Sequence, residues 1–226
     1  KLTGGEWAAD RWCAKGLANL DTGHMHPEWL ALLGRKESIC PPVRSMRDVI
    51  GCAVTNAWGI PADTPVMTGW SDALAAILAT GALDQHEVGF VLTGTSEIIG
   101  ASRREPRAQK GLFLVPPDVL ESSAGVYLHY GPTQAGGSSL QWISRLLGKP
   151  VEDSIPAETK LSSIVCRPWW QGERAPYWDH TLTASFDGLR EQHTAADVVL
   201  AVLQGVALQE RVVLERAGWG ATIKSI

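Results

Sequence analysis

The spacing of hydrophobic residues changes near residue 85, and this change divides the chain into two parts. In the first part the apolar residues recur mainly with the period of a helix. Helical segments are predicted at residues 7–14, with some loop character, and at residues 27–34, 49–58 and 73–80. The last of these is a run of good helix formers that Gly81 closes, and residues 65–68 before it favour a short buried strand.

Beyond residue 85, strand patterns separated by turn residues dominate. Three β segments in succession are predicted, at residues 88–102, 112–116 and 125–130. The first is itself a strand, a Gly-Thr-Ser turn and a second strand. A further strand is predicted at residues 164–169, and a last one begins near Ala221.

Two helices are predicted among these strands. One runs from Ser138 to Leu147 and ends at Gly148. The other begins at a capping box, Thr194–Asp197, and continues to about Arg216. This long helix is apolar on more than one face, so we expect it to be largely buried. Gly205 in its middle costs about 1 kcal/mol relative to Ala, and close packing of the helix on a sheet would explain its presence.

The composition is that of a folded α/β protein with two parts, residues 1–85 and 86–226. The 226 residues are 45% hydrophobic and 19% charged, with a net charge of −4 and no long basic run. Nucleic acid and anionic membranes are therefore not expected as partners. The four cysteines show no C-x-x-C spacing, and no apolar stretch is long enough for a signal peptide or a membrane span, so the expected location is the cytoplasm.

Two segments carry candidate chemistry. Asp72 stands at the start of a predicted helix, where it could be an N-cap or a carboxylate held ionised for acid–base work. The turn Gly94-Thr95-Ser96 could be an ordinary hairpin turn, or it could direct backbone N–H groups and two hydroxyls at a phosphate. A carboxylate and a phosphate turn close in sequence suggest phosphoryl transfer to a hydroxyl. His24, His26 and Glu28 are assigned to an exposed loop, so no metal site is expected.

Six short motifs follow one another along nearly the whole chain. They are Thr3-Gly4-Gly5-Glu6 with Asp10, Pro65-Val66 with Asp72, Gly94-Thr95-Ser96, Gly136-Gly137 with Gln141-Trp142, Gly172-Glu173-Arg174 with Pro176-Tyr177, and Leu203-Gln204-Gly205-Val206-Ala207. In type and order they resemble the FGGY carbohydrate kinases, the relatives of xylulokinase, ribulokinase, gluconokinase and glycerol kinase. Each motif alone is weak, but six in the right order are specific.

The resemblance implies a fold and a set of roles. The fold would be the actin/hexokinase-like, ribonuclease-H-like ATPase fold in part, with the sugar side in residues 1–85 and the nucleotide side in residues 86–226. Asp72 would be the catalytic base that takes the proton of a sugar hydroxyl. Gly94, Thr95 and Ser96 would contact the terminal phosphates of the nucleotide, and Gly136 and Gly137 would line its site, although a flexible helix entry is the simpler explanation of these two glycines.

The resemblance also implies cofactors and partners. These are ATP with Mg²⁺ and a sugar or polyol, with a ketopentose such as xylulose weakly favoured and a homodimer as an open alternative. Glu173 and Arg174 are expected to be structural. Trp70 and Ser71 stand where many relatives carry glycine, so the substrate assignment depends on more than the motifs.

The alternative function is a non-catalytic sugar- or nucleotide-binding relative, or an inactive fragment of such a kinase. The Asp-Gly-Thr phosphate loop and the Gly-Gly-Gly adenosine turn of the family do not occur in the sequence. We therefore expect the chain to be the central part of a longer kinase and to be inactive by itself. Retention of Asp72 and of the Gly-Thr-Ser turn favours the enzyme.

Overall fold

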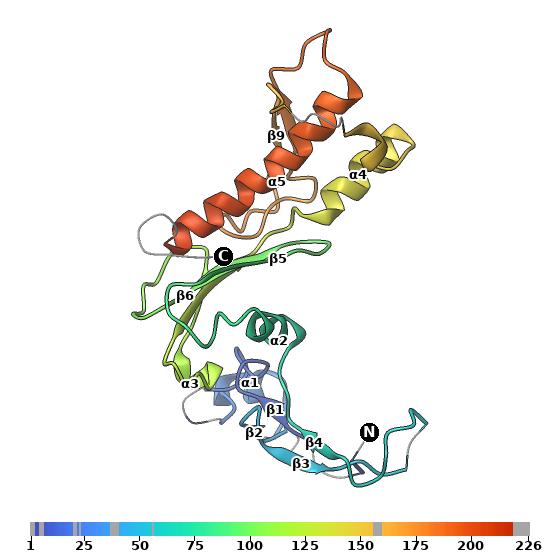
Figure 1. Cartoon of the computed structure of the whole chain (residues 1–226). Helices are drawn as coiled ribbons and strands as arrows, with labels where there is room; N and C mark the ends of the chain where they lie inside the picture. Colours follow the sequence, from blue (N-terminus) through green and yellow to red (C-terminus); the bar gives the residue numbers. More distant parts are fainter. Residues whose placement is uncertain are drawn as a thin grey trace. The chain divides into compact units, whose positions relative to one another are not determined.

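The computed structural model describes residues 3–4, 7–19, 22, 24–36, 41–55, 57–155 and 160–218. The chain forms two compact units, Lys1–Ala76 and Ile77–Ile226 (Figure 1). The strand expected near Ala221 and the pair Gly5-Glu6 of the first motif lie outside the described residues.

The first unit is built from short elements. Strand β1 (Ala9–Asp10) pairs in parallel with β2 (Val43–Arg44), and β3 (Val49–Cys52) pairs antiparallel with β4 (Pro65–Met67). Helix α1 (Pro27–Leu32) begins with proline at its first position and ends before Gly34, whose positive φ of 59° suits glycine. The helix predicted at residues 27–34 is thus confirmed, and the strand predicted at residues 65–68 is confirmed except that Pro65 and Met67 are exposed rather than buried.

Two predictions for the first unit were wrong. The segment predicted as a helix at residues 49–58 begins instead with strand β3, because β-branched Val49 and Ile50 enter the β3–β4 ladder, and an irregularity in its register falls between Val49 and Gly51. Gly51 has a φ of 152°, which a helix does not accept. Residues 7–14 form strand β1 and turns, because the buried side chain of Asp10 accepts hydrogen bonds from the N–H groups of Trp12 and Cys13 (2.9 and 3.0 Å).

Helix α2 (Asp72–Ala79) contains the point where the two units divide. The hydroxyl of Ser71 accepts a hydrogen bond from the N–H of Leu74 (3.4 Å), so Ser71 is the N-cap and Asp72 is the first helical residue. The boundary expected near residue 85 lies C-terminal to this division, which falls between Ala76 and Ile77. Leu83 and Gln85 hydrogen-bond the second unit through their carbonyl groups, which accept from the hydroxyls of Ser122 and Ser102.

The second unit contains a four-stranded antiparallel sheet with the order β5-β6-β8-β7. Its strands are β5 (Gly89–Leu92), β6 (Ile98–Arg103), β7 (Phe113–Val115) and β8 (Tyr127–Pro132). The central pair β6–β8 keeps register from Ile98 opposite Pro132 to Arg103 opposite Tyr127. The short helix α3 (Pro117–Leu120) lies between β7 and β8 in the chain. The three predicted β segments are therefore confirmed, the first as the hairpin β5–β6.

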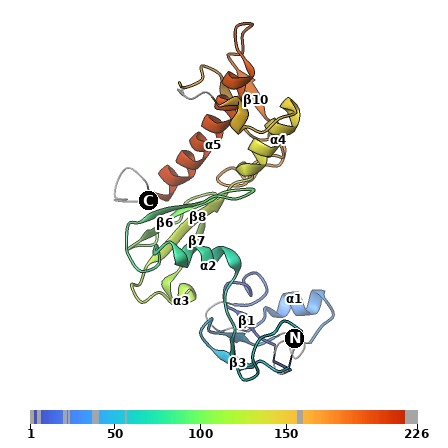
Figure 2. The same cartoon turned by 45° about the vertical axis from the view of Figure 1, so that its right-hand side comes forward.

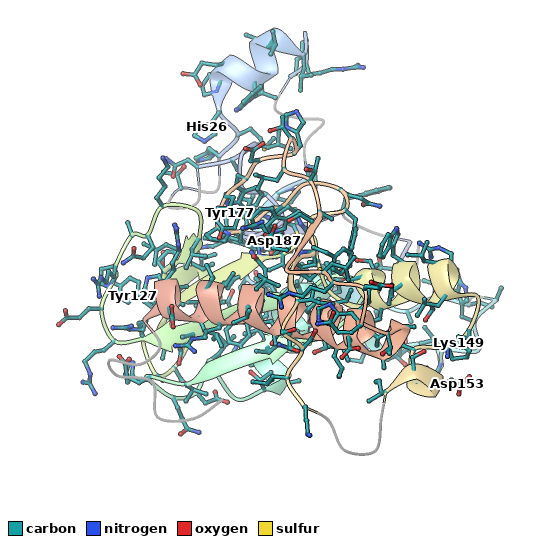
Figure 3. All side chains as sticks on the ribbon, turned by 90° about the horizontal axis from the view of Figure 1, so that it is seen from above. His26, Tyr127, Lys149, Asp153, Tyr177 and Asp187 are labelled. Carbon is teal, nitrogen blue, oxygen red and sulfur yellow. The ribbon has the colours of Figure 1, made fainter. Side chains whose placement is uncertain are left out.

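Helix α5 (Ala195–Ala217) connects the two halves of this unit. Figure 3 looks down on α5, which lies over the strands and runs from the end marked by Lys149 and Asp153 toward the end marked by Tyr127. Its C-terminal half packs on the sheet, with Val213 and Leu214 in one cluster with Ile99 and Ala175. Its N-terminal half forms a second cluster with α4 (Gly137–Leu147), the turn η2 (Glu152–Ser154) and β9 (Val165–Arg167).

The capping box and Gly205 behave as predicted. Thr194 and Asp197 exchange both hydrogen bonds of the box at the start of α5. A Cβ on Gly205 would lie 2.6 Å from the carbonyl oxygen of Cys166, so glycine allows α5 to approach β9 closely. Strand β9 does not join the main sheet but pairs with β10 (Ser185–Asp187) in a separate ribbon, which lies beside α5 (Figure 2).

Candidate functional site

The site begins at the loop of the β5–β6 hairpin. Leu92 pairs with Ile98, so residues 93–97 form the loop, and Gly94-Thr95-Ser96 are its tip. Thr95 is exposed and Ser96 is half-buried. The hairpin interpretation of this sequence is therefore confirmed, and phosphate binding by the two hydroxyls stays a prediction.

The start of α4 is packed directly against this turn. The N–H groups of Gly137 and Ser138 donate to the carbonyl oxygens of Gly94 and Thr95, each at 2.9 Å. A Cβ on Gly137 would lie 2.6 Å from the Gly94 oxygen, and a Cβ on Gly136 would lie 2.8 Å from the Cα of Ser96. Only glycine permits this approach. The two glycines thus fix the turn against the helix, and their direct contact with a nucleotide stays a prediction.

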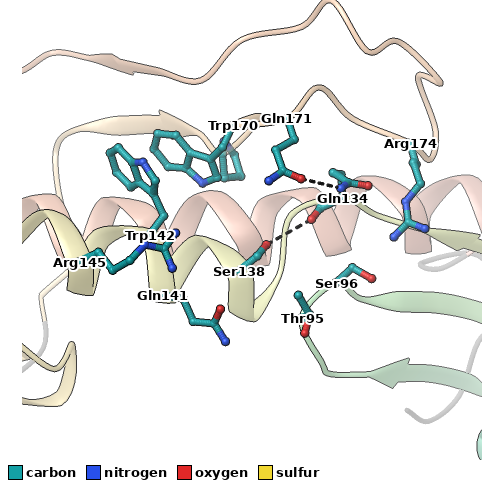
Figure 4. A pocket seen from close by; sticks show the side chains of 11 residues that line it. Thr95, Ser96, Gln134, Ser138, Gln141, Trp142, Arg145, Trp170, Gln171 and Arg174 are labelled. Carbon is teal, nitrogen blue, oxygen red and sulfur yellow. Dashed lines mark hydrogen bonds between the residues drawn. The ribbon is translucent and has the colours of Figure 1, made fainter.

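A pocket of about 380 Å³ opens beside the turn (Figure 4). Its lining comes from the turn, the start of α4, the loop before α4 and the segment after β9. The lining residues are Thr95, Ser96, Gln134, Ser138, Gln141, Trp142, Arg145, Pro168, Trp170, Gln171 and Arg174. Across the pocket wall, the amide of Gln134 donates to the side chain of Gln171 (3.1 Å), so two segments far apart in sequence are joined there.

The pocket has two chemically different ends. At one end the rings of Trp142 and Trp170 stack with centroids 3.7 Å apart and planes at 19°, near Arg145. At the other end lie Thr95, Ser96 and Arg174 (Figure 4). Stacked indoles offer a flat apolar wall, and hydroxyls with a guanidinium offer donors for an anion. The arrangement suits a ligand with an aromatic or apolar part and a negatively charged part.

The side chains of Glu173 and Arg174 hydrogen-bond the backbone around the pocket, rather than pairing with each other at the surface. Glu173 is 3% exposed. Its carboxylate accepts hydrogen bonds from the N–H groups of Gln134, Ala135 and Arg174, which lowers its pKa, but burial has the larger effect and raises it. The Arg174 guanidinium donates to the carbonyl oxygen of Thr133. Their structural role is as expected, but the part they support is the loop that leads into α4.

A second buried carboxyl lies behind the turn. Glu97, the residue after Ser96, is 2% exposed, and its backbone N–H donates to the hydroxyl of Thr133, the residue that follows β8 (3.2 Å). Burial, together with the negative charge of Glu210 on α5, raises the pKa of Glu97 to about 7. Sequence reasoning did not single out this residue. The only signal was a charged residue at the start of an otherwise apolar strand.

The structure brings together all five residues predicted on the nucleotide side, namely Gly94, Thr95, Ser96, Gly136 and Gly137. It adds residues that the motifs did not identify, chiefly Gln134, Arg145 and Gln171. These could not be predicted, because their proximity depends on the packing of β9 and its following segment against α4. Among the described residues, no group of three or more His, Cys, Asp or Glu side chains is arranged to hold a metal ion.

Comparison with known proteins shows the family of the chain. Residues 89–226 match the model for the C-terminal domain of the FGGY family of carbohydrate kinases, which is more than half of the chain. The chain belongs to the FGGY family of carbohydrate kinases. A curated FGGY relative, a xylulose kinase from Lactococcus lactis, is 28% identical over 155 residues, which are 66% of this chain and 30% of the relative.

Solved structures agree with this assignment. A ligand-bound xylulose kinase from Lactobacillus acidophilus is 26% identical with a TM-score of 0.75, and the match covers 97% of this chain and 46% of the kinase. A glycerol kinase from Plasmodium falciparum, solved with ADP, has a TM-score of 0.79 at 17% identity and matches 100% of this chain and 46% of its own, which shows the fold. The predicted fold, part of an actin/hexokinase-like ATPase, is confirmed, and this FGGY chain spans less than half of the length of these relatives.

The remaining predicted site residue, Asp72, lies in the first unit. It is exposed at the first position of α2, and its carboxylate accepts a hydrogen bond from the N–H of Ala73 (2.7 Å). Its role as the base of an FGGY kinase stays a prediction. Of the described helices, none is both long and apolar enough to cross a membrane.

Proposed function

We propose that this chain is part of a kinase that transfers the γ-phosphoryl group of ATP to a hydroxyl of a sugar. The observation that carries the proposal is the pocket beside the Gly94–Ser96 turn, with two hydroxyls and Arg174 at one end and the stacked tryptophans at the other. Such a pocket can accept the phosphates and the base of a nucleotide together. The glycerol kinase from Plasmodium falciparum was solved with ADP, which supports a nucleotide as the ligand class.

In the proposed reaction, Asp72 accepts the proton of the sugar hydroxyl as that oxygen attacks the γ-phosphorus and ADP leaves. The base must be unprotonated and within hydrogen-bond reach of the hydroxyl. Thr95 and Ser96 bind and orient phosphate oxygens, and Arg174, whose guanidinium also donates to the carbonyl oxygen of Thr133, adds positive charge at the same end of the pocket. Because the transition state of phosphoryl transfer is loose, this positioning contributes more than the base does.

Mg²⁺ is the expected metal, and it would neutralise the phosphate charge. Sites of this kind hold Mg²⁺ through the phosphates and one or two carboxylates, so they need no cluster of protein ligands. No proposed step requires several protein ligands on the ion.

The leading substrate is a ketopentose such as xylulose. The support is that xylulose kinases stand among the curated relatives and the structural neighbours. Glycerol and gluconate kinases stand there too, so polyols and sugar acids belong in the test. The alternative, a relative that binds sugar or nucleotide without catalysis, is distinguished by the same test.

The experiment is a coupled assay of ADP release by the full-length protein, with ATP, Mg²⁺ and a panel of pentuloses, hexuloses, glycerol and gluconate. We expect turnover with one class, and xylulose is the first candidate. Release of ADP with a polyol and with no other compound would show that the substrate is a polyol and not a ketopentose. Binding of ADP in the absence of turnover with every compound would favour the non-catalytic relative.

A further inference from the structure

The carboxyl of Glu97 occupies the space behind the Gly94–Ser96 turn. A Cβ on Gly136 would lie 2.7 Å from its Oε1, so the carboxyl lies directly against the start of α4. Within the described part of the chain, its buried Oε2 has no hydrogen-bond partner. Glu97 is therefore a buried acid in contact with both elements that form the hydroxyl end of the pocket.

The groups that act on this carboxyl come from three elements. The hydroxyl of Thr93 and the N–H of Gly94, in its own hairpin loop, hydrogen-bond it and favour the ionised form. Glu210 on α5 has the same charge and opposes ionisation, as burial does. In the connection from β8 to α4, the neighbours Thr133 and Gly136 carry no charge. Opposing influences of this kind leave the group titratable near neutral pH.

We propose that Glu97 is a positioning residue of the Gly94–Ser96 turn and that a nucleotide phosphate bound at this turn makes the Glu97 carboxyl take up a proton. This inference rests on the proposed function. The ionised carboxylate organises the empty turn through Thr93 and Gly94. A phosphate at Thr95 and Ser96 would then bring further negative charge close to a carboxylate that is shielded from water.

The direction of the effect follows from linkage. Phosphate binding disfavours the ionised carboxylate, so it raises the pKa of Glu97, and by reciprocity protonation of Glu97 strengthens nucleotide binding. Nucleotide affinity therefore falls as the pH rises through the pKa of about 7 of the free protein. If the bound nucleotide raises the pKa by about one unit, roughly half a proton is taken up near pH 7.5.

The test is calorimetric titration of the full-length protein with ADP and Mg²⁺ near pH 7.5, in buffers of different ionisation enthalpy. The dependence of the heat on the buffer gives the number of protons taken up. We expect roughly half a proton more for the wild type than for Glu97→Gln, which keeps the size and an acceptor oxygen but does not titrate. Glu105→Gln removes the same charge from an exposed position in the same unit and should match the wild type.

The outcomes separate the two proposals. No binding of ADP by the wild type would overturn the proposed function. Binding of ADP with equal proton uptake by wild type and Glu97→Gln would overturn only the role of Glu97. If Glu97→Gln does not fold, Glu210→Gln replaces it. Because this variant lacks the like charge, the pH at which proton uptake is largest should be lower for Glu210→Gln than for the wild type. An unchanged maximum would contradict the inference.

Discussion

The two units of the chain differ in how they bury their hydrophobic residues. Most buried apolar residues of the first unit are small, with Ala14, Ala18 and Ala53 among them, while Trp7 and Leu32 are 67% and 75% exposed. The second unit buries Phe90, Ile99, Leu128 and Ile143 almost completely. The predicted base stands on the first unit and the pocket on the second. Under the proposed function, the well-packed second unit would hold the nucleotide, whereas the first would supply an exposed carboxylate.

The largest expected effect separates the two units by function. In the full-length protein, Asp72→Asn should lower kcat by about 10²–10⁴-fold and leave ADP affinity nearly unchanged, because it removes a proton acceptor in the first unit and keeps the size of the side chain. Asp84→Asn, at an exposed position after the same helix, is the matched control. Steady-state kinetics and ADP titration measure both quantities. Near-normal turnover of Asp72→Asn would show that Asp72 is not the base and is only a carboxylate at the start of a helix.

The next effect concerns acid stability of the second unit. His129 is buried on β8 and accepts a hydrogen bond from the N–H of Arg107 (3.2 Å), and burial followed by the charge of Arg103 lowers its pKa to about 4. The neutral form is required in the folded state, so its contribution is present above pH 6.5 and is lost as the pH falls toward 4. The loss should be at most about 3 kcal/mol.

Urea unfolding of the wild type and of His129→Gln between pH 7.5 and 4.5 measures this loss. The variant should have the flatter pH dependence, because Gln keeps an acceptor and does not titrate. The buried acids Glu97 and Glu173 act in the opposite direction in both proteins, since their raised pKa values favour the folded state at low pH. Parallel curves for the two proteins would contradict the role of His129.

A smaller effect tests the contact between turn and helix. Gly137→Ala places a Cβ 2.6 Å from the Gly94 oxygen, and it should cost about 1–3 kcal/mol of stability and weaken ADP binding as well. Gly205→Ala is the matched control, because its Cβ meets the Cys166 oxygen at the same distance of 2.6 Å but away from the pocket. It should lower the Tm with little change in ADP affinity at temperatures where the protein stays folded. An equal loss of affinity in both variants would show that the turn has no special dependence on Gly137.

The smallest effect concerns one helix end of the second unit. Thr194→Ala removes the hydroxyl that accepts from the N–H of Asp197 and should destabilise the unit by about 1 kcal/mol, whereas Thr194→Ser should restore most of the loss. Chemical denaturation of the three proteins measures the difference. A stability of Thr194→Ala equal to that of the wild type would mean that the capping box does not stabilise α5.

Sequence reasoning was more accurate for the second unit than for the first. The hairpin β5–β6 and helices α4 and α5 carry long periodic patterns with glycine or capping residues at their ends, and such local signals determine the element almost alone. In the first unit, strand β3 was predicted as a helix, because four residues carry little periodicity and only the pairing with β4 decides their state.

The sequence by itself determined the family and those elements of the second unit that end at glycine or begin at a capping residue. It also determined the five candidate site residues that meet at one place, namely Gly94, Thr95, Ser96, Gly136 and Gly137. What only the tertiary structure decided is the environment of the acids. Glu97 and Glu173 look like ordinary polar positions in the sequence, yet both are buried. Glu97 lies against Gly136 at the start of α4, and Glu173 accepts hydrogen bonds from the backbone of the loop before α4. Burial and hydrogen-bond partners come from segments distant in the chain, and these set the pKa of a side chain, which no local pattern records.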